Sequence, residues 1–130
     1  ARKLGLDSSV VFLGNLSHEM VADLIAAADI CVIPSKVESF PLFALETLAC
    51  GKPLIGPNRG GITQIVENDK TGLLIPTHAP APIAEAIIRV LEEGEIRKTA
   101  KKVGPKLIKE RYSWRACAKK TLEVYEELAG

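Results

Sequence analysis

Two glutamates, Glu38 and Glu46, are the residues whose type and placement are best suited to chemistry. They bracket seven residues, where an apolar run ending at Pro34 gives way to an apolar helical pattern ending near Gly51. Free N–H groups at the start of a helix bind phosphate, and a carboxylate can accept hydrogen bonds from two neighbouring hydroxyls. Two carboxylates beside a helix start therefore suit a ligand with a diphosphate at its middle and hydroxyls at both ends. A nucleotide sugar has this layout.

The position of the two glutamates in the predicted fold is more informative than their spacing. With 16 acidic residues in 130, chance alone produces roughly two pairs of acids at this spacing. In an open α/β sheet, however, ligands bind beyond the carboxyl ends of the strands. A helix that begins near Pro41 places Glu46 about 7–8 Å along its axis. Glu46 would then lie near the ribose of the nucleotide, and Glu38 would face the other end of the ligand.

Four short, continuous apolar runs predict parallel strands that are covered on both faces. They are residues 10–13, 30–33, 53–56 and 72–75. Helical patterns separate them, at residues 19–28 after a cap at Ser17, at 42–50 with Pro41 in the first turn, and at 62–67. The alternation predicts an α/β fold, a Rossmann-like parallel sheet of about four strands flanked by helices.

From residue 80 onward the pattern is helical. We expect helices at residues 81–93, at 96–111 with an interruption at Gly104–Pro105, and after a cap at Ser113. The final helix carries an apolar stripe, which we expect to pack onto the sheet: Trp114, Cys117, Leu122, Tyr125 and Leu128. No repeat or linker divides the chain, so residues 1–130 are interpreted as one domain.

Composition excludes several classes of function. A net charge of +1 gives no reason to expect nucleic-acid binding, and no apolar run approaches the roughly 20 residues of a membrane span. Cys31, Cys50 and Cys117 are scattered, which is typical of reduced, buried thiols in a cytoplasmic protein. His18 and His78 are isolated and are interpreted as solvated residues near helix starts. We therefore expect neither a metal site nor a cofactor.

The segment ESFPLFALETLACGKP, residues 38–53, resembles the E-x7-E segment of the retaining glycosyltransferases of family 4, which have two Rossmann-like domains in the GT-B architecture. Shorter motifs extend the resemblance in the family's order, from about residue 10 to residue 128: VFLG at 11–14, AAD at 27–29, GGI at 60–62, ENDKTGLLIP at 67–76 and YSW at 112–114. The resemblance implies that the parent protein transfers a sugar from a nucleotide-diphosphate sugar to an acceptor hydroxyl, with retention of the anomeric configuration.

The resemblance also implies a role for each matching residue. Glu38 corresponds to the first acid, at the donor sugar and the reacting centre, and Glu46 to the second, which holds the ribose hydroxyls. The turn between them matches the one that cradles the sugar and the diphosphate, at Ser39, Phe40, Leu42 and Phe43. No metal is required, because helix N–H groups and a basic pair would offset the phosphate charge.

Two short loops complete the site that the resemblance implies. Gly14 and Asn15 match a turn that lies near the nucleobase. Gly60 and Gly61 match a loop at the mouth of the cleft, where the missing side chains allow close approach.

The chain departs from the family's pattern in two positions and in extent. Pro41 stands where many members have glycine, which removes a backbone donor, and Gln64 stands where the family usually has glutamate. The family's arginine–lysine pair precedes the stretch that this chain contains, and residues 1–6 have the pattern of a helix end. We therefore interpret residues 1–130 as the latter part of the C-terminal nucleotide-sugar-binding domain, without its first two strands, and expect this part alone to be inactive.

The missing strands have a consequence for partners. In the strand order 3-2-1-4-5-6, residues 10–13 and 30–33 would be separated by two absent strands. The sheet is then completed by rearrangement, by a partner copy, or by upstream strands or the N-terminal domain of the parent protein. Self-association therefore stays open. Attraction of the basic residues between 97 and 120 to an anionic membrane stays open as well, beside the interpretation that they form a solvated face.

Two other classes of function compete with the donor-binding interpretation. The first alternative is a non-catalytic structural or interaction module that retains the Rossmann-like fold, which the missing strands and Gln64 favour. The second is a dinucleotide-binding dehydrogenase domain, which is disfavoured because no G-x-G-x-x-G follows any predicted strand.

Overall fold

The computed structural model describes residues 1–76 and 79–130. A parallel three-stranded sheet in the order β1-β2-β3 lies at its centre, formed by β1 (Cys31–Val32), β2 (Leu54–Pro57) and β3 (Gly72–Ile75). The register pairs Cys31 with Leu54 and Ile55 with Leu73. The α/β fold with a parallel sheet is confirmed, with three strands among the described residues rather than about four.

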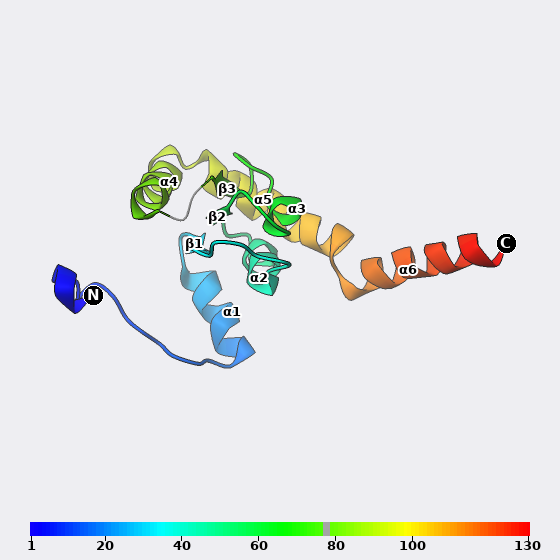
Figure 1. Cartoon of the computed structure of the whole chain (residues 1–130), viewed down its shortest axis with the longest axis horizontal. Helices are drawn as coiled ribbons and strands as arrows, with labels where there is room; N and C mark the ends of the chain where they lie inside the picture. Colours follow the sequence, from blue (N-terminus) through cyan, green and yellow to red (C-terminus); the bar gives the residue numbers. More distant parts are fainter. Residues whose placement is uncertain (77–78) are drawn as a thin grey trace.

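Helices alternate with the strands and then dominate the C-terminal part (Figure 1). A short 3₁₀ helix, η1, covers Arg2–Leu4. The helices interleaved with the strands are α1 (His18–Ala27), α2 (Leu42–Ala49) and α3 (Ile62–Ile65). They are followed by α4 (Pro80–Glu93), α5 (Glu95–Arg111) and α6 (Trp114–Ala129). None of the helices in the described residues is both long and apolar enough to cross a lipid bilayer.

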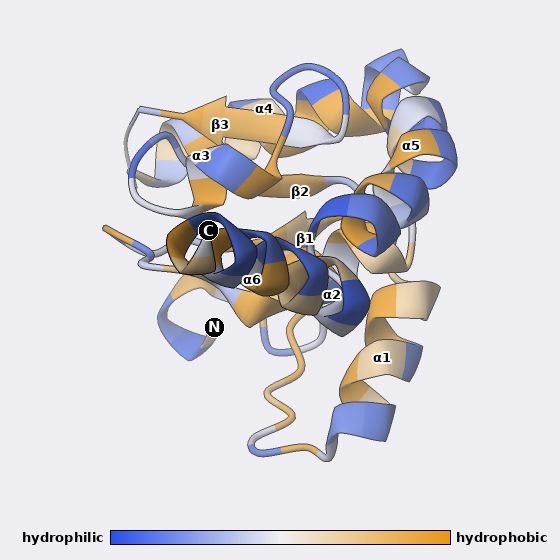
Figure 2. Cartoon of the chain, turned by 90° about the vertical axis from the view of Figure 1, so that its right-hand side faces the viewer, coloured by the Kyte–Doolittle hydropathy of each residue, from blue (hydrophilic) through white to orange (hydrophobic). Residues whose placement is uncertain are grey.

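The central strand β2 is covered on both faces, as its continuous apolar run predicts. Successive residues of a strand point to opposite faces, and Leu54 and Ile55 are both fully buried. Leu54 packs with Leu48 of α2 in one core cluster, and Ile55 packs with Val90 of α4 in the other. Figure 2 shows the apolar strands β2 and β3 enclosed by helices whose outer surfaces are more polar.

The contact between α2 and α5 depends on a glycine. A Cβ atom added to Gly104 would lie 2.5 Å from the carbonyl oxygen of Leu48. The prediction that this helix is interrupted at Gly104–Pro105 is wrong, because α5 continues through Pro105. Close packing on α2 outweighs the low helix propensity of these two residues.

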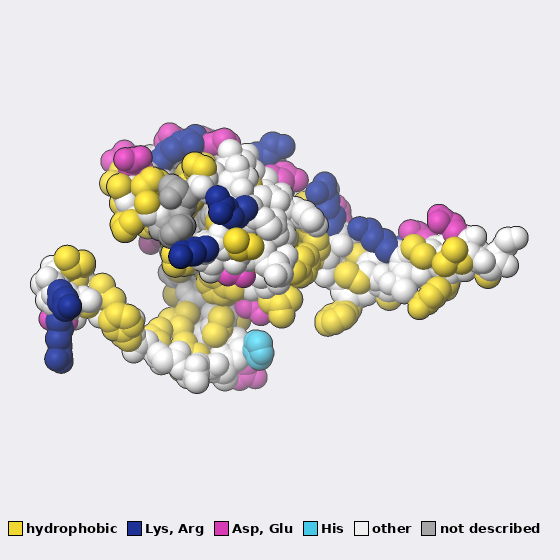
Figure 3. All heavy atoms as spheres, viewed as in Figure 1, with side chains coloured by type: hydrophobic (Ala, Val, Ile, Leu, Met, Phe, Trp, Pro, Cys, Tyr) yellow, Lys and Arg dark blue, Asp and Glu magenta, His cyan; other side chains and the backbone are white. Residues whose placement is uncertain are grey.

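The N-terminal segment does not form the strand predicted at residues 10–13. These residues are extended but exposed, with 77% of Val11 and 82% of Phe12 accessible. A strand needs a neighbour for its backbone groups, and within the described residues no sheet pairing involves this segment. Rearrangement has therefore not brought residues 10–13 beside β1. The segment lies apart from the sheet in Figure 1, and its apolar side chains are open to solvent in Figure 3.

The final helix also differs from its prediction. Ser113 caps α6 as expected, with its Oγ accepting a hydrogen bond from the Ala116 N–H at 3.2 Å. The apolar stripe does not pack onto the sheet, however, because Trp114 is 92% exposed and Leu128 80% exposed. Figure 1 shows the reason, since α6 projects away from the body of the structure.

The cysteines and histidines follow the predictions in part. Cys31 is buried, and burial raises the pKa of its thiol, so that it stays protonated in the core. Cys50 and Cys117 are free but exposed, which corrects the prediction that they are buried, because the end of α2 and the whole of α6 face outward. His18 is the first residue of α1 and is solvent-exposed, as predicted. His78 lies outside the described residues.

Candidate functional site

The loops that follow β1 and β2 meet at the carboxyl end of the sheet. Glu38 pairs with Gly60 in an isolated parallel bridge, and the Gly61 N–H donates a hydrogen bond to the Glu38 carbonyl at 2.8 Å. The structure therefore brings Glu38 and the two glycines together, although they are distant in the sequence. This edge is where an open α/β sheet presents its ligand site.

Gly60 and Gly61 make this junction possible. A Cβ atom on Gly60 would lie 2.1 Å from the Glu38 carbonyl oxygen, and one on Gly61 would lie 1.8 Å from the Ser39 carbonyl oxygen. Gly60 also has a φ of +76°, which favours glycine. The two loops are thus joined through main-chain atoms.

The turn before α2 leaves donors and apolar side chains accessible. Pro41 is the N-cap of α2 rather than part of its first turn, so its missing N–H leaves the donors of Leu42 and Phe43 in place. Phe40 is 47% exposed and Leu42 64% exposed. An anion at this helix start would meet free N–H groups and the positive end of the helix dipole.

Glu46 lies on α2 and faces the start of α1. Its side chain is 42% exposed, and its Oε1 lies 4.0 Å from His18 Nδ1. His18 was predicted to be a solvated residue only, because sequence alone did not bring α1 beside α2. The sequence feature that could have indicated this contact is the position of His18 at the start of the helix that precedes the E-x7-E segment.

Gly14 and Asn15 lie in the exposed N-terminal segment, away from this junction. Gly14 has a φ of +66°, and a Cβ atom there would meet nothing within 4 Å. Their placement near a nucleobase stays a prediction. In the described ranges 1–76 and 79–130, no group of three or more His, Cys, Asp or Glu side chains is placed to hold a metal ion.

Tyr112 supports the site from the end of α5 and is a residue that sequence reasoning did not single out. Its hydroxyl donates a hydrogen bond to the Gln64 carbonyl of α3, and its ring lies 6.1 Å from that of Phe40. Tyr112 thereby connects the loop after β1 with α3. The YSW motif at residues 112–114 contains Tyr112, but the motif alone does not indicate what its side chain contacts.

Removing the Tyr112 hydroxyl is expected to loosen this connection. We expect Tyr112→Phe to lower the free energy of unfolding by about 0.5–1.5 kcal/mol, because one hydrogen bond is lost while the ring contact remains. Thermal unfolding followed by circular dichroism measures the change. Tyr125→Phe is the matched control, because Tyr125 on α6 is 66% exposed. Equal changes in the two variants would show that the Tyr112 hydroxyl contributes nothing specific.

Solved structures of other proteins share this fold. Sucrose-phosphate synthase from Thermosynechococcus elongatus matches with a TM-score of 0.87 at 35% identity, over 98% of this chain and 32% of that chain. HepE of Anabaena, solved in complex with UDP, matches with a TM-score of 0.87 at 24% identity, over 97% of this chain and 34% of that chain. The chain therefore has the fold of a domain of the GT-B glycosyltransferase class.

The chain belongs to the glycosyl transferases group 1 family, which matches residues 1–107. It is 35% identical over 127 residues to the D-inositol 3-phosphate glycosyltransferase of Saccharomonospora viridis, covering 98% of this chain and 29% of that protein. The predicted family is confirmed. The chain spans about a third of the length of the relatives and structures that it matches.

Proposed function

We propose that this chain is part of the C-terminal domain of a retaining glycosyltransferase and supplies the site for its nucleotide-diphosphate sugar donor. The observation that carries the proposal is the junction of the Glu38 loop with Gly60 and Gly61, beside the start of α2 and Glu46. On this proposal, Glu38, Glu46 and the N–H groups at the start of α2 face the ligand together. A donor with a diphosphate between two hydroxyl-bearing sugars matches that order of groups.

Each part of the site then has a defined task. The N–H groups at the start of α2 hold the diphosphate, and Glu46 accepts hydrogen bonds from the ribose hydroxyls. Glu38 lies at the donor sugar, where the bond between the anomeric carbon and the diphosphate oxygen breaks and a bond to the acceptor oxygen forms. The nucleoside diphosphate leaves with the electron pair of the broken bond and takes up the proton of the acceptor hydroxyl, while donors at the helix start help to stabilise its negative charge. Groups from the rest of the parent protein complete the reaction, so this chain binds the donor without turning it over.

UDP is the first ligand to test. HepE was solved with UDP, and its likeness to this chain supports the choice of a uridine nucleotide as a probe. The chain should bind UDP in calorimetric or NMR titration, with shifts at Gly60, Gly61 and Leu42. No binding at millimolar UDP would overturn the proposal for this chain.

Glu46→Gln tests the role of the second carboxylate. We expect about 10–100-fold weaker UDP binding, because the charged acceptor of two ribose hydroxyls is lost. Glu92→Gln on α4 is the matched control, since Glu92 is exposed on a helix that carries no part of the proposed site. UDP affinity that survives Glu46→Gln unchanged would contradict the assigned role.

An interaction module is the second candidate function. The exposed apolar side chains of α6 and of residues 10–13 favour it, because apolar patches of this kind mark contact surfaces. Such surfaces would serve the rest of the parent protein, or a second copy of the chain, whether or not a nucleotide binds. A chain that self-associates and shows no UDP binding would favour this candidate.

A cytoplasmic location and peripheral membrane association of the parent protein remain proposals that rest on the cysteine pattern and the basic C-terminal helices.

A further inference from the structure

A second pocket lies at the end of the sheet opposite the proposed donor site. It is bordered by Asp29 and Pro53, which precede β1 and β2, and by Arg97 in the first turns of α5. Glu38 and Gly60 follow the same two strands at their carboxyl ends. Because parallel strands place all their amino ends at one edge, the two sites are separated by the sheet. The cavity measures about 360 Å³, within the range of small-molecule sites.

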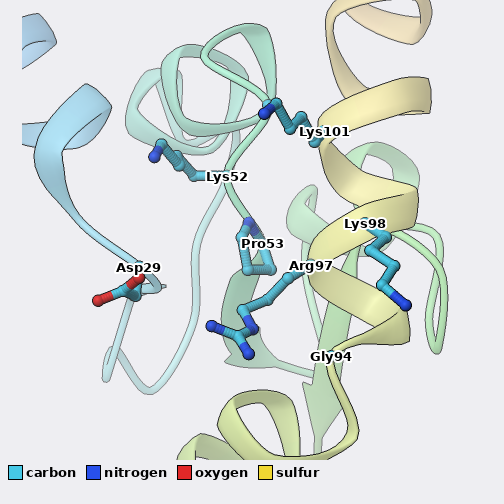
Figure 4. A pocket seen from close by; sticks show the side chains of 8 residues that line it. Asp29, Lys52, Pro53, Gly94, Arg97, Lys98 and Lys101 are labelled. Atoms are coloured by element: carbon cyan, nitrogen blue, oxygen red, sulfur yellow. The ribbon is translucent and has the colours of Figure 1, made fainter.

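The pocket is strongly basic. Four cationic side chains line it, against the single carboxylate of Asp29: Lys52, Arg97, Lys98 and Lys101. Figure 4 shows Lys52, Lys101 and Arg97 around Pro53, with Lys98 directed away from them. Lys98 forms an ion pair with Glu95 at 2.7 Å.

Two of these charges lack a protein counter-ion. Among the ion pairs of residues 1–76 and 79–130, none includes Lys52 or Lys101. The two lysines are brought together by the packing of α2 on α5, since a Cβ atom on Gly51 would lie 3.1 Å from the Lys101 Cα. An anion in the pocket would be attracted by both unpaired charges.

Arg97 adds an oriented guanidinium group. Its Nη2 donates a hydrogen bond to the Leu91 carbonyl at 2.9 Å, which anchors the group at the end of α4. Its Nε is buried and has no hydrogen-bond partner within the described part of the chain. The guanidinium is thereby held at the wall of the pocket, where its positive charge attracts a phosphate group.

We propose that the pocket formed by Lys52, Arg97 and Lys101 binds a phosphate monoester group, at a site separate from the diphosphate of the sugar donor. The ligand clamps the end of α2 to the start of α5. The phosphate belongs either to a small soluble molecule or to the headgroup of an anionic lipid, and both sources offer the same chemistry to the pocket.

Thermal unfolding of the chain with inorganic phosphate tests the proposal. Phosphate should raise the midpoint above the value in sodium chloride of equal ionic strength, because it binds the folded chain. In NMR spectra, the shifts at Gly94 and Lys101 should persist when saturating UDP occupies the donor site. Lys101→Gln should weaken phosphate binding by about fivefold or more, while Lys109→Gln, an exposed lysine of α5, should leave it unchanged.

Further results distinguish a lipid headgroup from a soluble ligand. Other results would overturn the proposal. Vesicles of phosphatidic acid and phosphatidylcholine that bind the chain, but bind the Lys101→Gln variant less, would identify a lipid headgroup. Phosphate binding without vesicle binding would identify a soluble ligand. Equal effects of phosphate and chloride, or equal phosphate affinity in Lys101→Gln and Lys109→Gln, would overturn the proposal. Because UDP binding is measured on the same samples, failure here is separable from failure of the donor site.

Discussion

Gly61→Ala is expected to push apart the two loops at the carboxyl end of the sheet. The added Cβ atom would lie 1.8 Å from the Ser39 carbonyl oxygen, which is main chain and cannot rotate away. Gly61 has an ordinary helical φ of −65°, so the effect is steric and does not come from backbone strain. We expect a loss of about 1–3 kcal/mol in the free energy of unfolding. UDP affinity should fall by about tenfold, because the Glu38 loop is displaced from the start of α2.

Thermal unfolding and UDP titration of the same samples measure both effects of Gly61→Ala. Glu92→Ala is a suitable control, because Glu92 is exposed on α4, away from the junction. Gly130→Ala controls for the general effect of replacing glycine, since a Cβ atom there meets nothing closer than 3.7 Å. A Gly61→Ala variant with the stability and UDP affinity of these controls would mean that the loops do not meet as described.

Leu48→Ala is expected to destabilise the chain more than the substitution of any exposed residue. Leu48 is fully buried between the sheet and α5, and its carbonyl contacts Gly104. Truncating a buried leucine leaves a cavity, and we expect a loss of about 2–5 kcal/mol. For a chain of this size, each kcal/mol lowers the unfolding midpoint by about 4 °C. The midpoint should therefore fall by about 8–20 °C.

Leu42→Ala provides the comparison within the same helix. Leu42 is 64% exposed, so its truncation removes little buried surface, and we expect a change of at most about 0.5 kcal/mol. Urea unfolding of both variants gives the free energies directly. A Leu48→Ala loss as small as that of Leu42→Ala would contradict the position of α2 between the sheet and α5.

The sequence predicted the elements whose partners lie within the chain. Strand β3 was predicted at residues 72–75 and α2 at residues 42–50, against the observed Gly72–Ile75 and Leu42–Ala49. Continuous apolar runs and helical spacing were sufficient there, because both elements are buried by neighbours in the same chain. Residues 10–13 and α6 also carry apolar patterns but have no such neighbour among the described residues, so their patterns did not predict packing.

The residues of the candidate site could be predicted from the sequence, but their arrangement in space could not. The glutamates and the glycine pair were found from the sequence, and the structure joins Glu38 to Gly60 and Gly61. His18 beside Glu46 and Tyr112 beside Phe40 depend on how separate helices pack. Local pattern carries no information about such contacts, because residues 40 and 112 are far apart in the sequence and are brought together only by the packing of α5.

The main-chain junction between the two loops also bears on how the site can evolve. Its contacts use the carbonyls of Glu38 and Ser39 and the backbone of Gly60 and Gly61. Mutation of the side chains at Ser39 and Phe40 therefore leaves the junction intact, whereas any side chain at position 61 collides with it. The side chains of one loop are therefore free to vary, while the other loop is confined to glycine at position 61.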